Sequence, residues 1–288
     1  MCLIFEGRNC RKRALTREER EARRDMADYS VSMIPVRDCR IRVMRAGSGS
    51  PLLFLHGGGG AGTWLPFMAR LAETFDVIVP EHPGFGESET PPWLDTVSDL
   101  ANFYLDFLKQ LDLDGVHLVG QSLGGWIAAE LAVRNTSRLA SLTLASAAGI
   151  HVKDIPQVDT FLSSDDQRIR DLFHDQKLAA AVLARALRPE VEDVALRNRM
   201  TTAKLVWQPR SHDPHLQKWL HRIDVPTLLI WGEHDRLFPK DYAFAYQRLI
   251  PGSKVVIIPD CGHLPEVEKA DVFAAELESF IGAMRIAA

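Results

Sequence analysis

The sequence predicts an α/β protein in which a mostly parallel central sheet is covered by helices on both faces. Short apolar runs, such as Leu52–Leu55 and Leu139–Ala145, alternate with stretches of helical periodicity along the 288 residues. A continuous apolar run is typical of a strand buried on both faces, as in parallel sheets. The alternation is interrupted once, between about residues 147 and 222, where helix formers and charges are frequent. We expect a helical insertion there.

The first part of the globular chain contributes strands and one helix to this architecture. Partial alternation from Val36 to Arg45 indicates a first strand or hairpin. Leu52–Leu55 is a buried strand that runs into a glycine-rich loop at residues 56–62. Val77–Pro80 is the next strand. Residues 97–111 place apolar side chains at helical intervals, so we expect a helix there.

A G-x-S-x-G motif at residues 120–124 lies between a predicted strand and a predicted helix. Residues 115–119 form a short apolar run, and residues 126–132 combine helix formers with apolar spacing. The sharp turn between them forces strained dihedral angles on Ser122, and the flanking glycines keep Cβ atoms out of the turn. A bare motif is more often a turn that caps a helix, but this context indicates a nucleophilic serine held above the sheet edge.

The remainder of the chain restores the strand–helix pattern. Pro226–Gly232 and Lys254–Ile258 are predicted strands, and a last helix is expected from Glu266 to Met284. The domain organisation that follows is a core of residues 26–146 and 223–288 with a helical cap at residues 147–222. The cap residues expected to face inward are Phe161, Leu162, Leu172, Phe173 and Trp207.

Residues 1–25 differ from the rest of the chain because charged side chains dominate them. Such a segment buries little apolar surface, so we predict a flexible extension that can be deleted with little loss of activity. Binding of nucleic acid by this basic stretch is the less favoured interpretation, because charge runs are usually solvated. The globular pattern begins just after Met26, which is a plausible alternative start.

Composition excludes several classes of protein. The net charge of −4 favours neither nucleic acid nor anionic lipid as a partner. No apolar run is long enough to span a membrane, and the order of charged and apolar residues at the start does not fit a secretory signal. We therefore expect a cytoplasmic protein. The cysteines are scattered without a C-x-x-C pair, which argues against a disulfide framework or a zinc site: Cys2, Cys10, Cys39 and Cys261.

A serine hydroxyl needs a base within hydrogen-bond reach, and the base needs an acid that orients it. His263 follows the strand at 254–258, and Asp235 follows the strand at 226–232. Both residues are therefore expected at the carboxyl edge of the sheet, where open α/β sheets place their sites. Asp260 is an alternative acid because it lies close to His263 in sequence, and Glu233 is a weaker one.

Four motifs in this order resemble the α/β-hydrolases of the cap-bearing group that includes carboxylesterases, lactonases and meta-cleavage product hydrolases. They are His56-Gly57-Gly58, Gly120-Gln121-Ser122-Leu123-Gly124, Gly232-Glu233-His234-Asp235 and Gly262-His263. The resemblance covers residues from about 36 to 284. It implies that Ser122 is the nucleophile, His263 the base and Asp235 the orienting acid. It also implies an oxyanion hole formed by the backbone N–H groups of Gly58 and Leu123.

The resemblance implies cleavage of a small carboxylic ester or lactone without a metal ion or an organic cofactor. Carbon–carbon bond hydrolases usually carry Asn before the nucleophile and Trp after the histidine, whereas this chain has Gln121 and Leu264. That activity is an alternative, as is a ligand-binding sensor with little turnover. The expected partner is a small-molecule substrate, with a homodimer as one option. Neighbours of the motifs that could line a pocket, or equally pack in the core, are Trp64, Trp126, Phe238 and Leu264.

Overall fold

The computed structural model describes residues 28–186 and 189–287. Within these residues, eight strands form one sheet in the order β1-β2-β4-β3-β5-β6-β7-β8. Pairs from β4 to β8 are parallel, whereas β1–β2 and β2–β4 are antiparallel. The predicted α/β class with a mostly parallel sheet is confirmed. The strands are β1 (Ser30–Val36), β2 (Cys39–Ala46), β3 (Pro51–Leu55), β4 (Asp76–Pro80), β5 (Val116–Gln121), β6 (Leu139–Ala145), β7 (Thr227–Gly232) and β8 (Lys254–Ile258).

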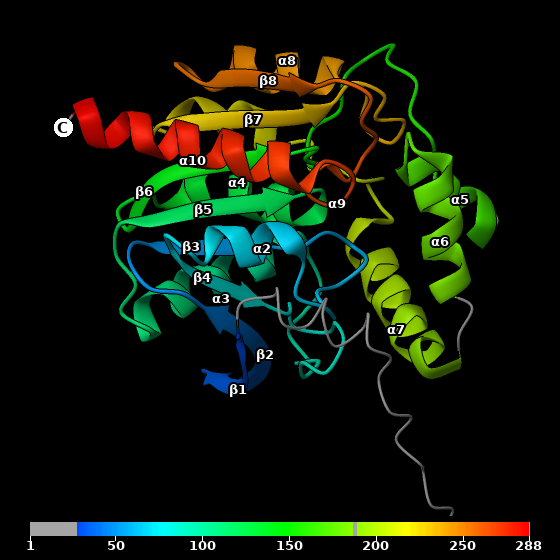
Figure 1. Cartoon of the computed structure of the whole chain (residues 1–288), viewed down its shortest axis with the longest axis horizontal. Helices are drawn as coiled ribbons and strands as arrows, with labels where there is room; N and C mark the ends of the chain where they lie inside the picture. The colour runs from blue at the N-terminus through cyan, green and yellow to red at the C-terminus, as the bar shows by residue number, and fades with distance from the viewer. Residues whose placement is uncertain (1–27, 187–188, 288) are drawn as a thin grey trace, which may run out of the picture.

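Helices cover both faces of this sheet. In Figure 1, α10 and α2 lie in front of it, with α3, α4 and α8 behind, and α5–α7 stack beyond the carboxyl ends of β5 and β7. The α-helices are α2 (Pro66–Leu71), α3 (Val97–Gln110), α4 (Leu123–Arg134), α5 (Asp165–Leu172), α6 (Gln176–Ala186), α7 (Pro189–Val206), α8 (Asp241–Leu249), α9 (Pro265–Glu268) and α10 (Ala270–Ala287). Two 3₁₀ turns, η1 (Leu216–Lys218) and η2 (Leu220–Arg222), precede β7.

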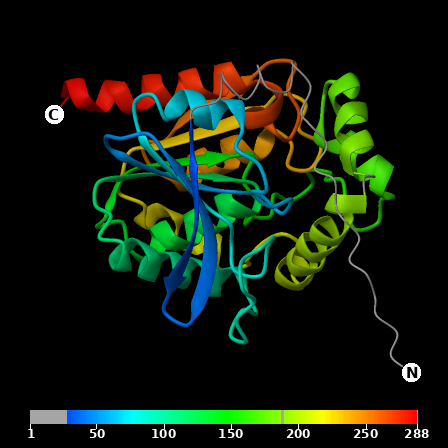
Figure 2. The same cartoon turned by 60° about the horizontal axis from the view of Figure 1, so that its bottom comes forward.

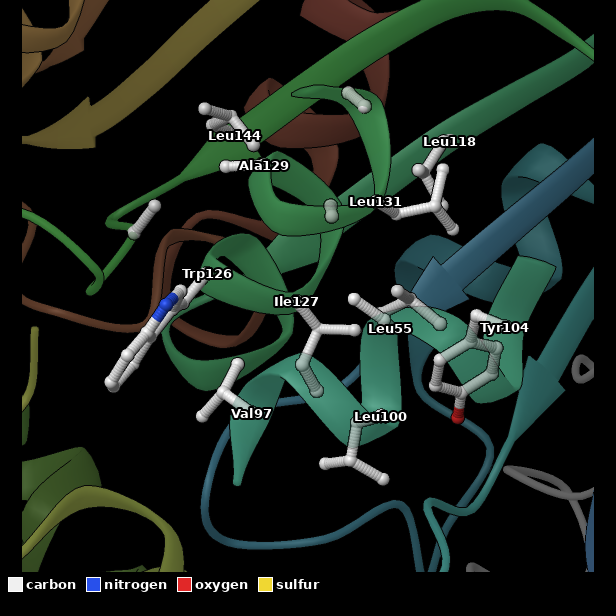
Figure 3. Packing of buried hydrophobic residues seen from close by; sticks show 14 of the residues in the cluster. Leu55, Val97, Leu100, Tyr104, Leu118, Trp126, Ile127, Ala129, Leu131 and Leu144 are labelled. Carbon is white, nitrogen blue, oxygen red and sulfur yellow. The ribbon is translucent and has the colours of Figure 1, made fainter. Parts of the chain in front are cut away.

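Two apolar cores hold the helices against the sheet. The first packs α3, α4 and α8 on one face, and Figure 3 shows part of it, with Ile127 of α4 and Leu100 of α3. The second packs α2 and α10 on the other face, and Phe67 and Phe273 meet there edge to face. The central strands β3 and β5 are buried on both faces, as the continuous apolar runs predict.

The strand order places four loops together at one edge of the sheet. β3 lies between β4 and β5. The connection that leaves β3 leads to β4 on one side, whereas the connection that leaves β5 leads to β6 on the other side. Loops that leave the carboxyl ends at such a switch point form a crevice between them. The glycine loop after β3 and the turn after β5 are therefore neighbours. The loops after β7 and β8 join them from the same edge.

The segment between β6 and β7 contains the helices α5, α6 and α7, which Figure 2 shows at the end of the molecule opposite the C-terminus. Its entry and exit are joined at a neck, where the N–H of Gly149 donates to Ser211 and the N–H of Asp213 donates to Gly149. Leu216 and Leu220 pack into the first core on one side of this neck, and Leu205 and Val206 pack into it on the other. We refer to residues 150–210, which the neck encloses, as the helical excursion.

Three details differ from expectation or lie outside it. The single C-terminal helix expected from Glu266 is wrong, because the backbone of Lys269 (φ −133°, ψ 49°) separates the one-turn α9 from α10. Leu162 and Trp207 do not face inward as expected, since they are 82% and 51% exposed. The predicted extension at residues 1–25 lies outside the described residues. No helix of the described part of the chain has the length and apolar character needed to cross a membrane.

Candidate active site

Ser122 lies in a strained turn between β5 and α4. Its backbone has φ 52° and ψ −113°, a conformation that residues other than glycine rarely adopt. A Cβ on Gly124 would lie 2.0 Å from the carbonyl oxygen of Leu55, and one on Gly120 would lie 2.3 Å from the carbonyl oxygen of Gly124. Glycine is therefore required because α4 starts directly against β3 and β5. The turn leaves the Ser122 side chain partly exposed, as the motif predicts.

A chain of hydrogen bonds connects Ser122 to a histidine and an aspartate. Nε2 of His263 lies 3.0 Å from Oγ of Ser122, and Nδ1 of His263 lies 2.9 Å from Oδ2 of Asp235. Asp235 and His263 are buried, with 5% and 1% of their surfaces exposed. The structure therefore brings together the three residues that the sequence selects. This arrangement suits transfer of a proton from the hydroxyl to the imidazole.

Asp235 is itself held by the loop in which it lies. Its Oδ1 accepts hydrogen bonds from the backbone N–H groups of Leu237 (2.9 Å) and Phe238 (3.0 Å), which leaves Oδ2 for His263. The alternative acids lie elsewhere: the side chain of Asp260 is 75% exposed and close to His174, and Glu233 pairs with Lys240. Asp235 is the acid that reaches His263.

The glycine loop after β3 lies beside Ser122. A Cβ on Gly57 would be 3.2 Å from Cβ of Ser122. Helix α7 holds this loop from above: Oγ1 of Thr202 donates to the carbonyl of Gly58 (3.0 Å), and Nδ2 of Asn198 donates to the carbonyl of Gly59 (2.9 Å). The loop therefore packs between the serine turn and the helical insertion.

Two buried histidines fix the base of this loop as neutral side chains. The rings of His56 and His82 stack with centroids 3.6 Å apart. The backbone N–H of His82 donates to Nε2 of His56, so the proton of His56 is on Nδ1, which donates to the carbonyl of Gly57. Burial lowers the pKa of His56 to about 4 and that of His82 well below its usual range. His56 thus shapes the loop.

Residues 50–270 match the family described as alpha/beta hydrolase fold. This chain belongs to that family. A relative from Metapseudomonas resinovorans, 2-hydroxy-6-oxo-6-(2'-aminophenyl)hexa-2,4-dienoic acid hydrolase, is 25% identical over 281 residues, which are 93% of this chain and 96% of that protein. Lipase 1 of Psychrobacter immobilis is 26% identical over 244 residues, covering 81% of this chain and 77% of the lipase.

A solved structure superimposes closely on this chain. The crystal structure of a membrane phospholipase A, described as a bacterial virulence factor, matches with a TM-score of 0.78 and 26% identity over 92% of this chain and 90% of that chain. The relatives include a dienoic acid hydrolase as well as lipases, so membership of the family does not fix the bond that is cleaved.

The four pocket candidates of this family member separate into two groups. Phe238 and Leu264 lie at the site: the ring of Phe238 is 5.5 Å from the His263 ring, and Leu264 packs on the apolar cluster of α5 and α6. Trp64 and Trp126 lie in the two cores instead. Trp64 stacks on Tyr29, and the indole N–H of Trp126 donates to Glu130.

Two further residues support the His263 loop: Gln121 lies within the G-x-S-x-G motif, and Glu268 lies outside all four motifs. Nε2 of Gln121, the last residue of β5, donates to the carbonyl of His263 over 3.1 Å. The carboxylate of Glu268 accepts from the backbone N–H groups of Gly262 (2.7 Å), His174 (3.2 Å) and Asp175. Glu268 therefore joins the His263 loop to the start of α6. No local pattern pairs residues 174–175 with 268, so the sequence carries no signal for this contact.

Glu266 is an unusual buried acid close to this loop. It is 4% exposed, and its Oε2 has no hydrogen-bond partner. Burial raises the pKa of Glu266 to about 8, and the charge of Asp235 adds to the shift. At neutral pH this side chain is mostly protonated, so it adds little negative charge beside Asp235.

Proposed function

We propose that this protein is a serine hydrolase that cleaves a small carboxylic ester or lactone through an acyl-enzyme. The observation that carries the proposal is the unbroken hydrogen-bond chain from Oγ of Ser122 through His263 to Asp235. A serine hydroxyl is a weak nucleophile, and an adjacent base of fixed orientation makes it reactive. Membership of a hydrolase family supports the same conclusion.

The proposed reaction has two stages. Oγ of Ser122 attacks the ester carbonyl while Nε2 of His263 takes its proton, and the imidazolium then gives that proton to the leaving alcohol as the ester C–O bond breaks. Water, deprotonated by His263, attacks the acyl-enzyme and releases the acid. Asp235 holds the imidazole with Nδ1–H towards Oδ2 and stabilises the positive charge that it acquires. These steps need no group from outside the chain other than water.

We assign the oxyanion hole to the backbone N–H groups of Leu123 and Gly58. Leu123 is the first residue of α4, and the first N–H groups of a helix have no acceptor within the helix. The helix dipole adds positive potential at the same point. The glycine loop lies beside Ser122 at Gly57, which supports the proposal that the N–H of the next residue, Gly58, supplies the second donor.

The helical excursion at residues 150–210 is proposed to act as a lid that selects the substrate. It touches both sides of the site: the carbonyl of Leu172 accepts from the N–H of His263, and α7 holds the glycine loop through Thr202. Enclosure by this segment would exclude water and favour small or medium acyl groups over long chains. Phe161, edge-on to the half-exposed Trp207, belongs to the same excursion.

Cleavage of a carbon–carbon bond is the second candidate, because a dienoic acid hydrolase matches nearly the whole chain. Two residues favour the ester instead. The amide N–H of Gln121 is directed to the backbone of His263, and Leu264 packs against the helical excursion. The amide N–H of Gln121 is thereby engaged by the backbone, and the side chain of Leu264 carries no polar group.

A fluorophosphonate probe with a substrate panel tests the proposal. The panel contains p-nitrophenyl esters of increasing chain length, aliphatic and aromatic lactones, and a 2-hydroxy-6-oxo-dienoate. Labelling of Ser122 with turnover of short esters or lactones is the expected result. Faster turnover of the dienoate would favour the carbon–carbon hydrolase. Absence of labelling and of turnover on every substrate would contradict the hydrolase and favour a ligand-binding sensor.

A further inference from the structure

A cluster of two histidines and one aspartate lies outside the Ser122 hydrogen-bond chain. His174 is in the loop between α5 and α6, His234 follows β7, and Asp260 follows β8. Each residue offers one donor atom, and these atoms all lie within 4.8 Å of one another. Three loops that are distant in sequence thus present two imidazole nitrogens and one carboxylate oxygen at a single point.

We propose that this cluster binds a divalent transition-metal ion, with Zn²⁺ as the best match. Two imidazoles and a carboxylate suit Zn²⁺, Co²⁺, Ni²⁺ or Cu²⁺, whereas Mg²⁺ and Ca²⁺ prefer oxygen donors only. Three protein ligands leave the fourth tetrahedral position to water. With bonds of about 2.0–2.1 Å, tetrahedral donors lie about 3.4 Å apart. Since the donor atoms lie within 4.8 Å of one another, each pair has to approach by about 1.4 Å at most.

The backbone around the cluster is fixed, while the side chains are free to make this adjustment. The N–H of His234 donates to Cys261 (2.8 Å), and that of His174 donates to Glu268 (3.2 Å). A Cβ on Gly262 would be 2.7 Å from the backbone nitrogen of His174, so the loops touch directly. The side chains of His174, His234 and Asp260 are 41%, 46% and 75% exposed, which lets them rotate and lets an ion enter.

One further feature supports a binding role. The rings of His174 and His234 are already neighbours, stacked with centroids 4.2 Å apart and an angle of 15°. Nδ1 or Nε2 of each histidine becomes available by rotation about the ring bond, because both rings are partly exposed.

A bound ion would link the helical excursion to the loops that carry the Ser122 partners. His234 precedes Asp235 directly, and Asp260 lies three residues before His263. His174 belongs to the excursion. An ion that binds the folded chain and not the unfolded chain raises the melting temperature in proportion to the logarithm of its concentration. The ion thus joins the helical excursion to the loops after β7 and β8 and takes no part in the reaction at Ser122.

Calorimetric titration of the untagged, metal-free full chain with Zn²⁺ tests the proposal. A Cys2→Ser, Cys10→Ser background removes the two cysteine thiols of the N-terminal segment. Binding of one Zn²⁺, a rise of several degrees in Tm and no response to Mg²⁺ are expected. His174→Ala, His234→Ala and Asp260→Asn should each weaken binding at least tenfold. His221→Ala, which removes an exposed histidine outside the cluster, should not.

Outcomes are read from binding and Tm, so they do not depend on the substrate or on Ser122. Melting in EDTA checks that each variant is folded, and Co²⁺ in place of Zn²⁺ reports four-coordinate geometry through its visible absorption. Equal Zn²⁺ affinity in all variants would overturn the site, as would no Zn²⁺ binding by the parent chain. Loss in His221→Ala to the same extent as in His174→Ala would show non-specific histidine binding, which also overturns it.

Discussion

The backbone N–H of His263 donates to the carbonyl oxygen of Leu172 over 2.8 Å. Leu172 is the last residue of α5, so His263, whose side chain contacts Ser122, donates its backbone N–H to an acceptor in the helical excursion. The position of His263 therefore depends on contacts with α5 and α6 as well as on β8. Changes in the excursion are expected to reach the site through this contact.

Replacement of Ser122 by alanine should abolish hydrolysis and leave the fold intact. Loss of a triad nucleophile lowers turnover by about a million-fold. The side chain is only partly buried, so its truncation costs little packing. Turnover of the best ester in the panel and the Tm are the two measurements. More than a tenth of the parent activity in Ser122→Ala would contradict the role of this residue.

Glu268→Gln should weaken both the fold and the activity. The carboxylate accepts three backbone N–H groups, and an amide presents a donor to at least one of them. A cost of about 1–3 kcal/mol in unfolding free energy follows from one such bond to a charged group. We expect kcat to fall more than KM rises, because the His263 loop is displaced. Glu276→Gln on α10 is the control. Equal kinetics in the two variants would show that Glu268 does not position the loop.

Gly124→Ala should prevent stable folding or cost about 3 kcal/mol or more, because the new Cβ would overlap the carbonyl oxygen of Leu55. Gly282→Ala on α10 is the matched control, since a Cβ there meets no atom within 4 Å and alanine favours a helix. Urea unfolding measures both. Similar stability of the two variants would mean that α4 can shift away from β3.

The stability difference between Glu266→Gln and the parent should depend on pH. The folded pKa of about 8 lies above the ordinary value of 4.5, so the folded state keeps a proton that the unfolded chain releases. This contribution is fully present below about pH 4.5 and is lost as pH rises towards 8. The unfolding free energy of the variant should therefore rise relative to that of the parent by a few kcal/mol between pH 5 and 8, on the order of 1.4 kcal/mol per pH unit. A constant difference across that range would place an ionised carboxylate at Glu266.

The buried histidine pair should make the protein less stable in acid. The folded pKa of His56 is about 4, below the ordinary 6.5, so the unfolded chain takes up a proton that the folded chain does not. The contribution of neutral His56 to the unfolding free energy is fully present above about pH 6.5 and is lost as pH falls to 4. His56→Asn should reduce that slope, whereas His221→Asn at an exposed position should not. An unchanged slope in His56→Asn would assign the acid sensitivity to other groups.

The parts of the site that depend on a local pattern could be predicted from the sequence. Ser122 lies in a motif flanked by a strand and a helix, and Asp235 and His263 each follow an apolar run. The sequence favours Asp235 and leaves Asp260 as an alternative acid, and the structure separates the two, because Asp235 contacts His263 whereas the side chain of Asp260 is 75% exposed. The contact of Glu268 with residues 174–175 joins segments more than 90 residues apart and leaves no periodic signal.

Some elements of the fold also could not be read from the pattern. The apolar spacing continues through Lys269, so the break between α9 and α10 is invisible in the sequence. Trp64 follows the glycine loop in the chain, yet its side chain is buried in the second core, between the sheet and the helices α2 and α10. Proximity in sequence to a motif does not tell on which face of the sheet a large side chain is buried.

The neck at Gly149 and residues 211–213 closes the helical excursion with two backbone hydrogen bonds, and Nε2 of Gln217 donates to the carbonyl of His151 beside them. The two backbone bonds themselves require no particular side chain. A segment grafted at the neck from another protein of the family would therefore have to supply its own acceptor for the N–H of His263, in place of the carbonyl of Leu172, to keep His263 beside Ser122.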